Sequence, residues 1–132
     1  MATILRARNE AVSRNTCVTV CKSDLSAPLQ CNTGTNWRTG WLAFVNADCS
    51  ATLNVPAAND IFVRAGPFDA SFTLSSNATN TTKLMFSATG FARPGDAGRF
   101  NLQYLSETRS SNRGICLSPL GRTRMVELDG TC

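Results

Sequence analysis

The sequence contains no histidine, which is the commonest general base and metal ligand near neutral pH. The cysteines also include no Cys-x-x-Cys pair, the spacing used by many zinc sites and thiol redox centres. No Gly-x-Ser-x-Gly segment marks a serine nucleophile, and the acidic residues form no evident catalytic pair. We therefore expect no enzymatic activity, no metal site and no cofactor.

Long apolar runs are absent as well. No apolar run approaches the ~20 residues needed to cross a bilayer, and the N-terminus lacks the apolar core of a secretory signal. With 132 residues, of which 42% are hydrophobic, the chain is long enough to bury roughly two-thirds of its unfolded surface. We expect a single domain that spans residues 1–132.

The cysteines are even in number and scattered, a pattern typical of disulfides formed in an oxidising compartment. They are Cys17, Cys21, Cys31, Cys49, Cys116 and Cys132. This pattern indicates an exported domain. Because no export signal is present, we expect an N-terminal segment of the natural protein to be missing and the Met1-Ala2 start to be artificial.

One N-terminal helix followed by many short strands is predicted. Apolar residues in 3–15 fall near one stripe of a helix: Ile4, Leu5, Ala7, Ala11 and Val12. Residues 16–132 contain alternating, β-branched segments separated by glycine and proline. The predicted strands are residues 16–21, 40–45, 60–64, 71–75, 83–87, 98–104, 114–118 and 122–128. We expect an α+β domain in which the helix packs on antiparallel sheet.

The predicted strands suggest how the cysteines pair. If residues 16–21 pair antiparallel with residues 40–46, Cys21 lies near the loop that contains Cys31, and Cys17 lies near Cys49. The third pair then closes the C-terminal segment. Among the fifteen connectivities that six cysteines allow, local geometry favours Cys17–Cys49, Cys21–Cys31 and Cys116–Cys132.

The net charge of +4 is concentrated near the C-terminus. Residues 93–124 contain six arginines and two acidic residues, whereas the rest of the chain has seven basic and seven acidic residues. The six are Arg93, Arg99, Arg109, Arg113, Arg122 and Arg124. Such a segment favours a polyanionic partner.

Arg122 and Arg124 are the candidate binding residues. On a strand they project from one face about 6.6 Å apart, because each residue rises ~3.3 Å. Each guanidinium can then contact a phosphate in bidentate geometry. Arg109 and Arg113 precede the same hairpin and are expected to extend the patch, whereas Glu127 points to the opposite face. The alternative is that the arginine pair is solvated or paired with nearby acids.

Nothing near these arginines is typical of base recognition, since no recognition helix and no aromatic stacking platform accompany them. We expect a polyanion to be bound here without sequence preference. Trp37 and Trp41 flank a glycine turn, and either a ligand platform or packing in the core fits them; we favour packing. The phenylalanines recur inside predicted strands and are expected in the core.

Several motifs follow one another in a recognisable order. The helix end ARNEAVSRN (residues 7–15) runs into VTVC (18–21), and WRTGWLAF (37–44), LMFSATG (84–90) and GRTR (121–124) follow. This order, which spans almost the whole chain, resembles the GspH/FimT family of type IV minor pilins and type II secretion pseudopilins. The resemblance implies a pilin-like α+β domain in which residues 3–15 are the end of a longer helix.

The resemblance also implies location and partners. Family members begin with a leader and a long hydrophobic helix, both absent here, that anchors in the bacterial inner membrane and later packs in the filament. The expected location is therefore the inner membrane, the periplasm and the extracellular pilus, with other minor and major pilins as partners and no enzymatic activity.

In FimT-like members the closing Gly-Arg-x-Arg motif binds DNA during natural transformation. Here that role maps onto Gly121, Arg122, Thr123 and Arg124. The alternative is a structural minor pilin or pseudopilin that initiates or caps pilus assembly without binding DNA.

Overall fold

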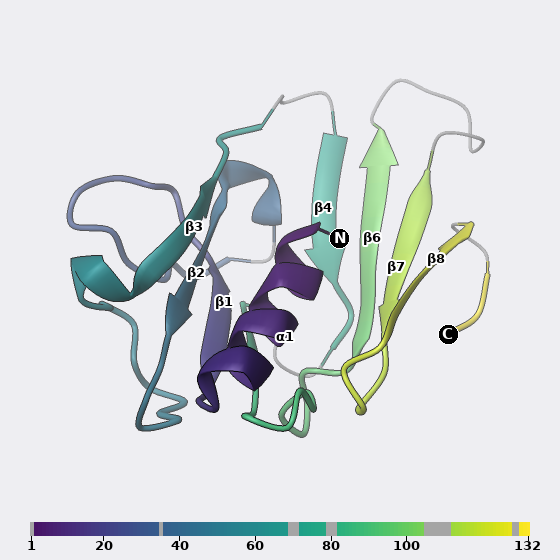
Figure 1. Cartoon of the computed structure of the whole chain (residues 1–132). Coiled ribbons are helices and arrows are strands. Elements are labelled where there is room, and N and C mark those ends of the chain that lie inside the picture. Colours follow the sequence, from purple (N-terminus) through teal and green to yellow (C-terminus); the bar gives the residue numbers. More distant parts are fainter. Residues whose placement is uncertain (1, 35, 69–71, 79–81, 105–111, 128–129) are drawn as a thin grey trace.

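The computed structural model describes residues 2–34, 36–68, 72–78, 82–104, 112–127 and 130–132. In this part of the chain the N-terminal helix α1 (Ala2–Arg14) is followed by eight strands (Figure 1). They are β1 (Val18–Lys22), β2 (Trp41–Val45), β3 (Ile61–Ala65), β4 (Phe72–Ser76), β5 (Lys83–Phe86), β6 (Gly98–Tyr104), β7 (Arg113–Leu117) and β8 (Thr123–Glu127). Two 3-10 helices, η1 (Trp37–Thr39) and η2 (Ala58–Asp60), lie in the connections.

The strands form two antiparallel four-stranded sheets. The first sheet has the order β3-β2-β1-β5, and the second has the order β4-β6-β7-β8. Strand β1 pairs antiparallel with β2, as the sequence predicts. The predicted α+β class, with a helix on antiparallel sheet, is confirmed. Figure 1 shows α1 in front of β1, on the side toward the second sheet.

A small-residue face lets α1 lie close to the sheets. Ile4, Ala7 and Ala11 recur at the spacing of one helix face and are buried, and both alanines are fully inaccessible. They join one apolar core with residues of both sheets, including Val20 of the first sheet and Phe100 of the second. The helix therefore closes a core that both sheets share. Among the described residues, no helix is long and apolar enough to cross a membrane.

The long connections around the first sheet are tied down by disulfides. Two of the three disulfides, Cys17–Cys49 and Cys21–Cys31, join β1 and its flank to these connections, with Cα–Cα distances of 5.3 and 5.5 Å. The third is Cys116–Cys132. These are the three pairs predicted from the pairing of the first two strands.

The sheets are linked through the segment between β5 and β6. The buried Asp96 carboxylate accepts a hydrogen bond of 2.8 Å from the backbone N–H of Met85 in β5. Arg93 donates to both oxygens of this carboxylate, at 3.0 and 2.9 Å. The segment that leads into the second sheet is thereby fastened to the edge of the first.

The eight predicted strands all occur, with ends shifted by up to two residues, and the helix spans residues 2–14 where 3–15 was predicted. The 3-10 helices were not predicted. Helix η1 lies near the end of the connection between β1 and β2, and Asn36 caps it by accepting a hydrogen bond from Arg38 N. The same Asn36 Oδ1 accepts from Leu74 N of β4. This short helix therefore also fastens the second sheet.

Replacement of Asp96 by alanine should destabilise the fold. Asp96→Ala leaves Arg93 and the Met85 N–H without their acceptor in a buried place, so the free energy of unfolding should fall by about 3 kcal/mol. Urea unfolding with the disulfides intact measures the change. The exposed Asp48→Ala is the matched control and should change stability by less than about 0.5 kcal/mol. Equal stability of the two variants would contradict the assigned role.

Candidate nucleic-acid interface

The arginine motif lies in the tight turn between β7 and β8, at the edge of the second sheet. The turn closes through hydrogen bonds from Gly121 N to Ser118 O and from Ser118 N to Arg122 O, both 2.9 Å. The Ser118 hydroxyl also accepts from Arg122 N at 3.2 Å. Gly121 has φ of +77°, a conformation that favours glycine. The motif therefore begins in a defined turn and continues as strand β8.

The strand register places Arg124 on the outer face of the second sheet. Arg124 lies opposite Cys116 of β7, which lies opposite Arg99 of β6, and residues directly opposite one another share a face. Phe100 and Ile115 alternate with them and contact the core. The outer face is therefore the one that does not face α1 and the first sheet.

Arg122 and Arg124 are both exposed and line the same open hollow on this hairpin. The rest of the hollow is formed by the start of β6, the end of β7, the turn and the C-terminal cysteine: Ala97, Gly98, Cys116, Leu117, Ser118, Pro119, Leu120, Thr123 and Cys132. Except for the two arginines, these lining residues carry no charged side chain. The hollow therefore has a basic wall with no acidic side chain in it.

The C-terminal residues are held against the same face. Arg124 Nη2 donates to the carbonyls of Thr131 and Cys132, at 2.8 and 3.2 Å. Arg99 donates to the carbonyl of Gly130 and, at 2.9 Å, to that of Glu127. Together with Cys116–Cys132, these bonds fix residues 130–132. They also orient the Arg124 guanidinium.

Arg99 is consequently a structural residue. Its side chain crosses β7 over Gly114, where a Cβ atom would lie 2.5 Å from Arg99 Nε. Glycine at 114 is what allows the guanidinium to reach the C-terminal carbonyls.

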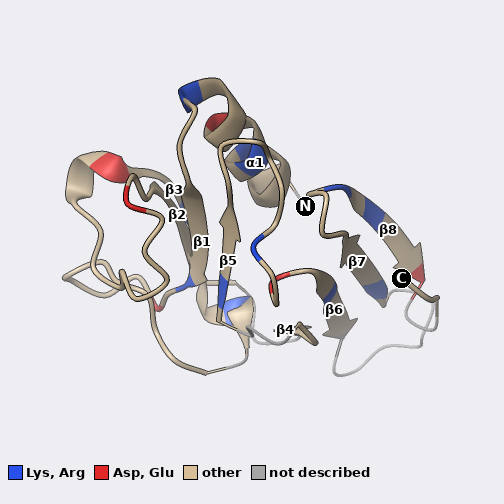
Figure 2. Cartoon of the chain, turned by 90° about the horizontal axis from the view of Figure 1, so that it is seen from below, with Lys and Arg blue, Asp and Glu red and all other residues tan. Residues whose placement is uncertain are grey.

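The arginines of residues 93–124 do not form one patch. Arg93 is paired with Asp96, and Arg109 lies outside the described residues. Arg113 lies opposite Glu127 in the β7–β8 register, and this pair lies on the other face from Arg124. We expected Arg113 to extend the patch formed by Arg122 and Arg124, and this register corrects that expectation. Arg113 is three residues from Cys116 on β7, and an odd separation on a strand places two side chains on opposite faces. Figure 2 shows basic positions on β6, β7 and β8, with an acidic position near the end of β8.

Gly121 and Thr123 shape the turn. A Cβ on Gly121 would lie 1.9 Å from the carbonyl oxygen of Gly90, so only glycine fits at this contact. Thr123 Oγ1 is buried and has no hydrogen-bond partner among the described residues. Gly121 and Thr123 thus face the protein interior, while Arg122 and Arg124 face solvent.

Arg8 of α1 is a residue near this turn to which the sequence assigned no role. Its Nε donates to Gly90 O at 3.1 Å. The contact joins residues 82 positions apart, and no local pattern predicts it. The sequence signal that could have drawn attention to Arg8 is its place in the helix-end motif of residues 7–15.

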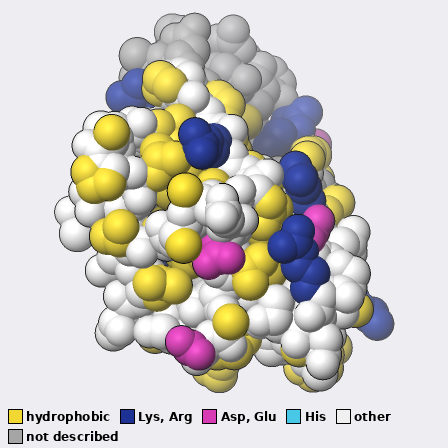
Figure 3. Space-filling model, turned by 60° about the vertical axis from the view of Figure 1, so that its left-hand side comes forward, with side chains coloured by type: hydrophobic (Ala, Val, Ile, Leu, Met, Phe, Trp, Pro, Cys, Tyr) yellow, Lys and Arg dark blue, Asp and Glu magenta, His cyan; other side chains and the backbone are white. Residues whose placement is uncertain are grey.

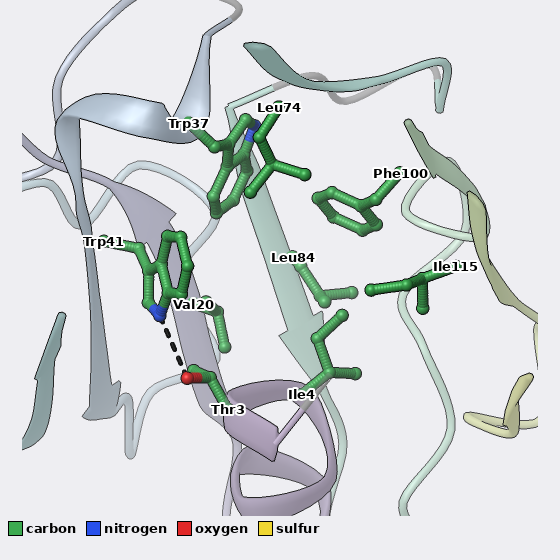
Figure 4. A pocket seen from close by; sticks show the side chains of 9 residues that line it. All are labelled: Thr3, Ile4, Val20, Trp37, Trp41, Leu74, Leu84, Phe100 and Ile115. Carbon is green, nitrogen blue, oxygen red and sulfur yellow. Dashed lines mark hydrogen bonds between the residues drawn. The ribbon is translucent and has the colours of Figure 1, made fainter. Parts of the chain in front are cut away.

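A second candidate, the tryptophan pair, lines a small cavity between the sheets (Figure 4). The cavity measures about 50 Å³, far below the roughly 300 Å³ at which ligand pockets begin. Trp41 Nε1 donates to Thr3 Oγ1 at 2.9 Å, and Trp37 packs edge-to-face on Phe100 with ring centroids 5.4 Å apart. This geometry agrees with packing in the core.

The part of the chain that the structure describes contains no group of three or more cysteine or acidic side chains placed to hold a metal ion. The arginine hairpin is the candidate site. Its chemistry is that of anion binding, because guanidinium groups are permanently charged and donate paired hydrogen bonds to phosphate oxygens.

The fold and the hairpin define a pilin-like domain. Two crystal structures of the type IV minor pilin FimU from Pseudomonas aeruginosa (strain PAO1) share the fold, with TM-scores of 0.61 and 0.62 and sequence identities of 21% and 22%. Each comparison covers 95% of this chain, with 85% and 81% of the FimU chains. The comparison with curated proteins gave no match.

The family follows from the sequence model of type II transport protein GspH, which matches residues 1–121. The chain belongs to the GspH family, and its fold is that of the FimU structures. Its family and fold are those of structural pilins. The match ends at Gly121, so Arg122 and Arg124 follow the matched residues.

Substitution of Gly121 by alanine should destabilise the fold by more than the positive φ of this residue alone would cause. Gly121→Ala places a methyl group against Gly90 O, so we expect the free energy of unfolding to fall by about 2–3 kcal/mol. Gly34→Ala is the control, because Gly34 also has positive φ, at +103°, while the nearest atom to a new Cβ is 3.4 Å away. Thermal or urea unfolding compares the two. An equal loss would mean that the Gly90 contact adds nothing.

Proposed function

We propose that this protein is a minor pilin that binds double-stranded DNA during DNA uptake, through Arg122 and Arg124. The observation that supports the proposal is the placement of two exposed arginines in one open hollow of the β7–β8 hairpin. Glu127, the acidic residue of β8, lies on the other face of the strand. The two positive charges are therefore not neutralised by the acid nearest to them on β8.

Both guanidinium groups have donors left for a phosphate. An arginine carries five N–H donors. Arg124 uses Nη2 for the C-terminal carbonyls, and the Arg122 side chain has no hydrogen-bond or ion-pair partner among the described residues. One arginine is thus held in place while its neighbour stays available. The arrangement suits two adjacent phosphates of a backbone.

Other basic side chains offer less. On the face shown in Figure 3, basic side chains at one edge have an acidic side chain beside them. Arg14 of α1, for example, pairs with Glu10 at 2.6 Å. Arg6 and Arg14 also lie over the ring of Phe62, with guanidinium carbons 5.4 and 5.7 Å from its centroid. These arginines pack on the fold, so the hairpin remains the preferred anion site.

The expected affinity of one domain is low. Two neutralised phosphates correspond to a salt slope of about −1.8, or about a tenfold loss of affinity between 50 and 200 mM salt. In a filament, several DNA-binding subunits would raise the effective concentration of phosphate-binding groups. We therefore place the function in a subunit that is anchored in the inner membrane and displayed in the extracellular pilus.

Removal of the two hairpin charges should abolish most DNA binding. Arg122→Gln with Arg124→Gln should weaken binding of duplex DNA at 50 mM salt by about tenfold and flatten the salt slope toward zero. Fluorescence polarisation with two unrelated duplexes measures both quantities and tests sequence preference.

The matched control is Arg6→Gln with Arg64→Gln, which also removes two positive charges, but from exposed residues of α1 and β3. This control should bind DNA within about twofold of the parent domain. If both double variants lose affinity equally, net charge alone explains binding and the hairpin site is wrong.

An experiment in cells distinguishes a role in DNA uptake from a role in pilus assembly. A deletion strain complemented with the Arg122→Gln and Arg124→Gln chain should form pili normally but lose natural transformation, because the substitutions remove the phosphate-binding groups and, within the described part of the fold, only the exposed Arg124 bonds to Thr131 and Cys132. Counting pili and transformants gives the two readouts. Unimpaired transformation, or lost piliation, would instead favour a subunit that initiates or caps assembly without binding DNA.

A further inference from the structure

The β7–β8 turn, the Gly90 carbonyl and Arg8 of α1 meet at one place. Arg8 Nε donates to Gly90 O at 3.1 Å, in a partly buried place. The same oxygen lies 1.9 Å from where a Cβ of Gly121 would be, and Arg8 Nε lies 2.8 Å from that point. Arg8, Gly90 and Gly121 therefore meet at one contact, although they come from three distant parts of the chain.

A second contact fastens the same two segments. Ala92 N donates to Pro119 O at 3.0 Å, which joins residues 87–92 to the β7–β8 turn. Ala92 also forms a bridge with Phe86 of β5, at the edge of the first sheet. The turn that carries the arginine motif is thus held by a loop, and that loop is held by both α1 and the first sheet.

Arg8 differs from the other two arginines of α1 in its direction. Arg6 and Arg14 approach Phe62 of β3, whereas Arg8 reaches the loop at Gly90. Arginine side chains of α1 thus contact β3 on one side of the helix and the Gly90 loop on the other. Arg6 provides a matched control for Arg8.

We infer that Arg8 is a positioning residue for the DNA-binding hairpin: it holds the Gly90 carbonyl in the place against which Gly121 packs. The inference rests on the proposed function of Arg122 and Arg124. Without the bond from Arg8, the Gly90 loop has fewer constraints, and the turn spends less time in the arrangement that presents both arginines. The apparent dissociation constant rises as that competent fraction falls.

Two substitutions separate positioning from direct phosphate contact. Glutamine carries its amide nitrogen the same number of bonds from Cα as arginine Nε, so Arg8→Gln retains a donor for Gly90 O and removes the charge. Methionine has the same reach without a donor. Arg8→Met should weaken duplex DNA binding about threefold to tenfold, the range for one lost hydrogen bond, at an unchanged salt slope. Arg8→Gln and the control Arg6→Met should stay within about twofold of the parent domain.

Other outcomes overturn the inference. If Arg8→Gln and Arg8→Met weaken binding equally and each makes the salt slope shallower by about 0.9, Arg8 is itself a phosphate ligand. If neither substitution changes DNA binding, the hairpin does not depend on Arg8.

Hydrogen exchange tests the same contact without DNA. The amide of Ala92, bonded to Pro119 O, should exchange about threefold to tenfold faster in Arg8→Met and at the parental rate in Arg8→Gln. Unchanged exchange in Arg8→Met would refute the positioning role. If the parent domain fails to bind DNA while Ala92 exchange responds as expected, the proposed function is wrong and the contact made by Arg8 stands.

Discussion

The second sheet has to be held against the first without strand pairing between them, and the position of the arginine hairpin depends on how this is done. Each sheet is a separate hydrogen-bonded unit. Contacts among the described residues connect them, including the edge-to-face packing of Trp37 on Phe100, the bond from Leu74 N to Asn36, the Asp96 carboxylate at β5, and the Gly90 loop against the β7–β8 turn. The shared apolar core brings the sheets together, while these specific contacts set where the hairpin lies relative to α1.

Local patterns were sufficient to predict the elements of the fold. Alternating β-branched segments between glycine and proline predicted every strand, because period-two burial is a local property of a chain packed on one face. Antiparallel pairing of β1 and β2 then brought the first four cysteines together in the predicted pairs. Helix η1 was not predicted, although its Asn36 cap is a local feature. The bond from Leu74 N to Asn36, across 38 residues, is the part that depends on the fold. No local pattern contains that information.

The candidate site was predictable only in part, because charge along the sequence does not report charge on one surface. The segment containing residues 93–124 holds all of the net positive charge, yet Arg93 and Arg99 have partners inside the fold. The position of Arg113 follows from parity alone: it is three residues from Cys116, so the pleat turns it to the other face. The same rule correctly separates Glu127 from Arg124. Parity is therefore informative within one strand, but it places residues of two strands on one face only when their register is known.

The Gly-Arg-x-Arg motif combines two physical requirements that alternate along the chain. Gly121 packs against a backbone carbonyl, and Thr123 buries its hydroxyl, while Arg122 and Arg124 line the hollow outside. Glycine is needed because the turn touches the Gly90 loop, whereas the turn itself needs neither arginine side chain: among the described residues, Arg124 bonds only the backbone of Thr131 and Cys132. A motif of this kind can lose its arginines and keep its fold, but it cannot lose its glycine so easily. Pilin-like domains with the glycine and without the arginines would accordingly retain the docked turn while lacking the anion site.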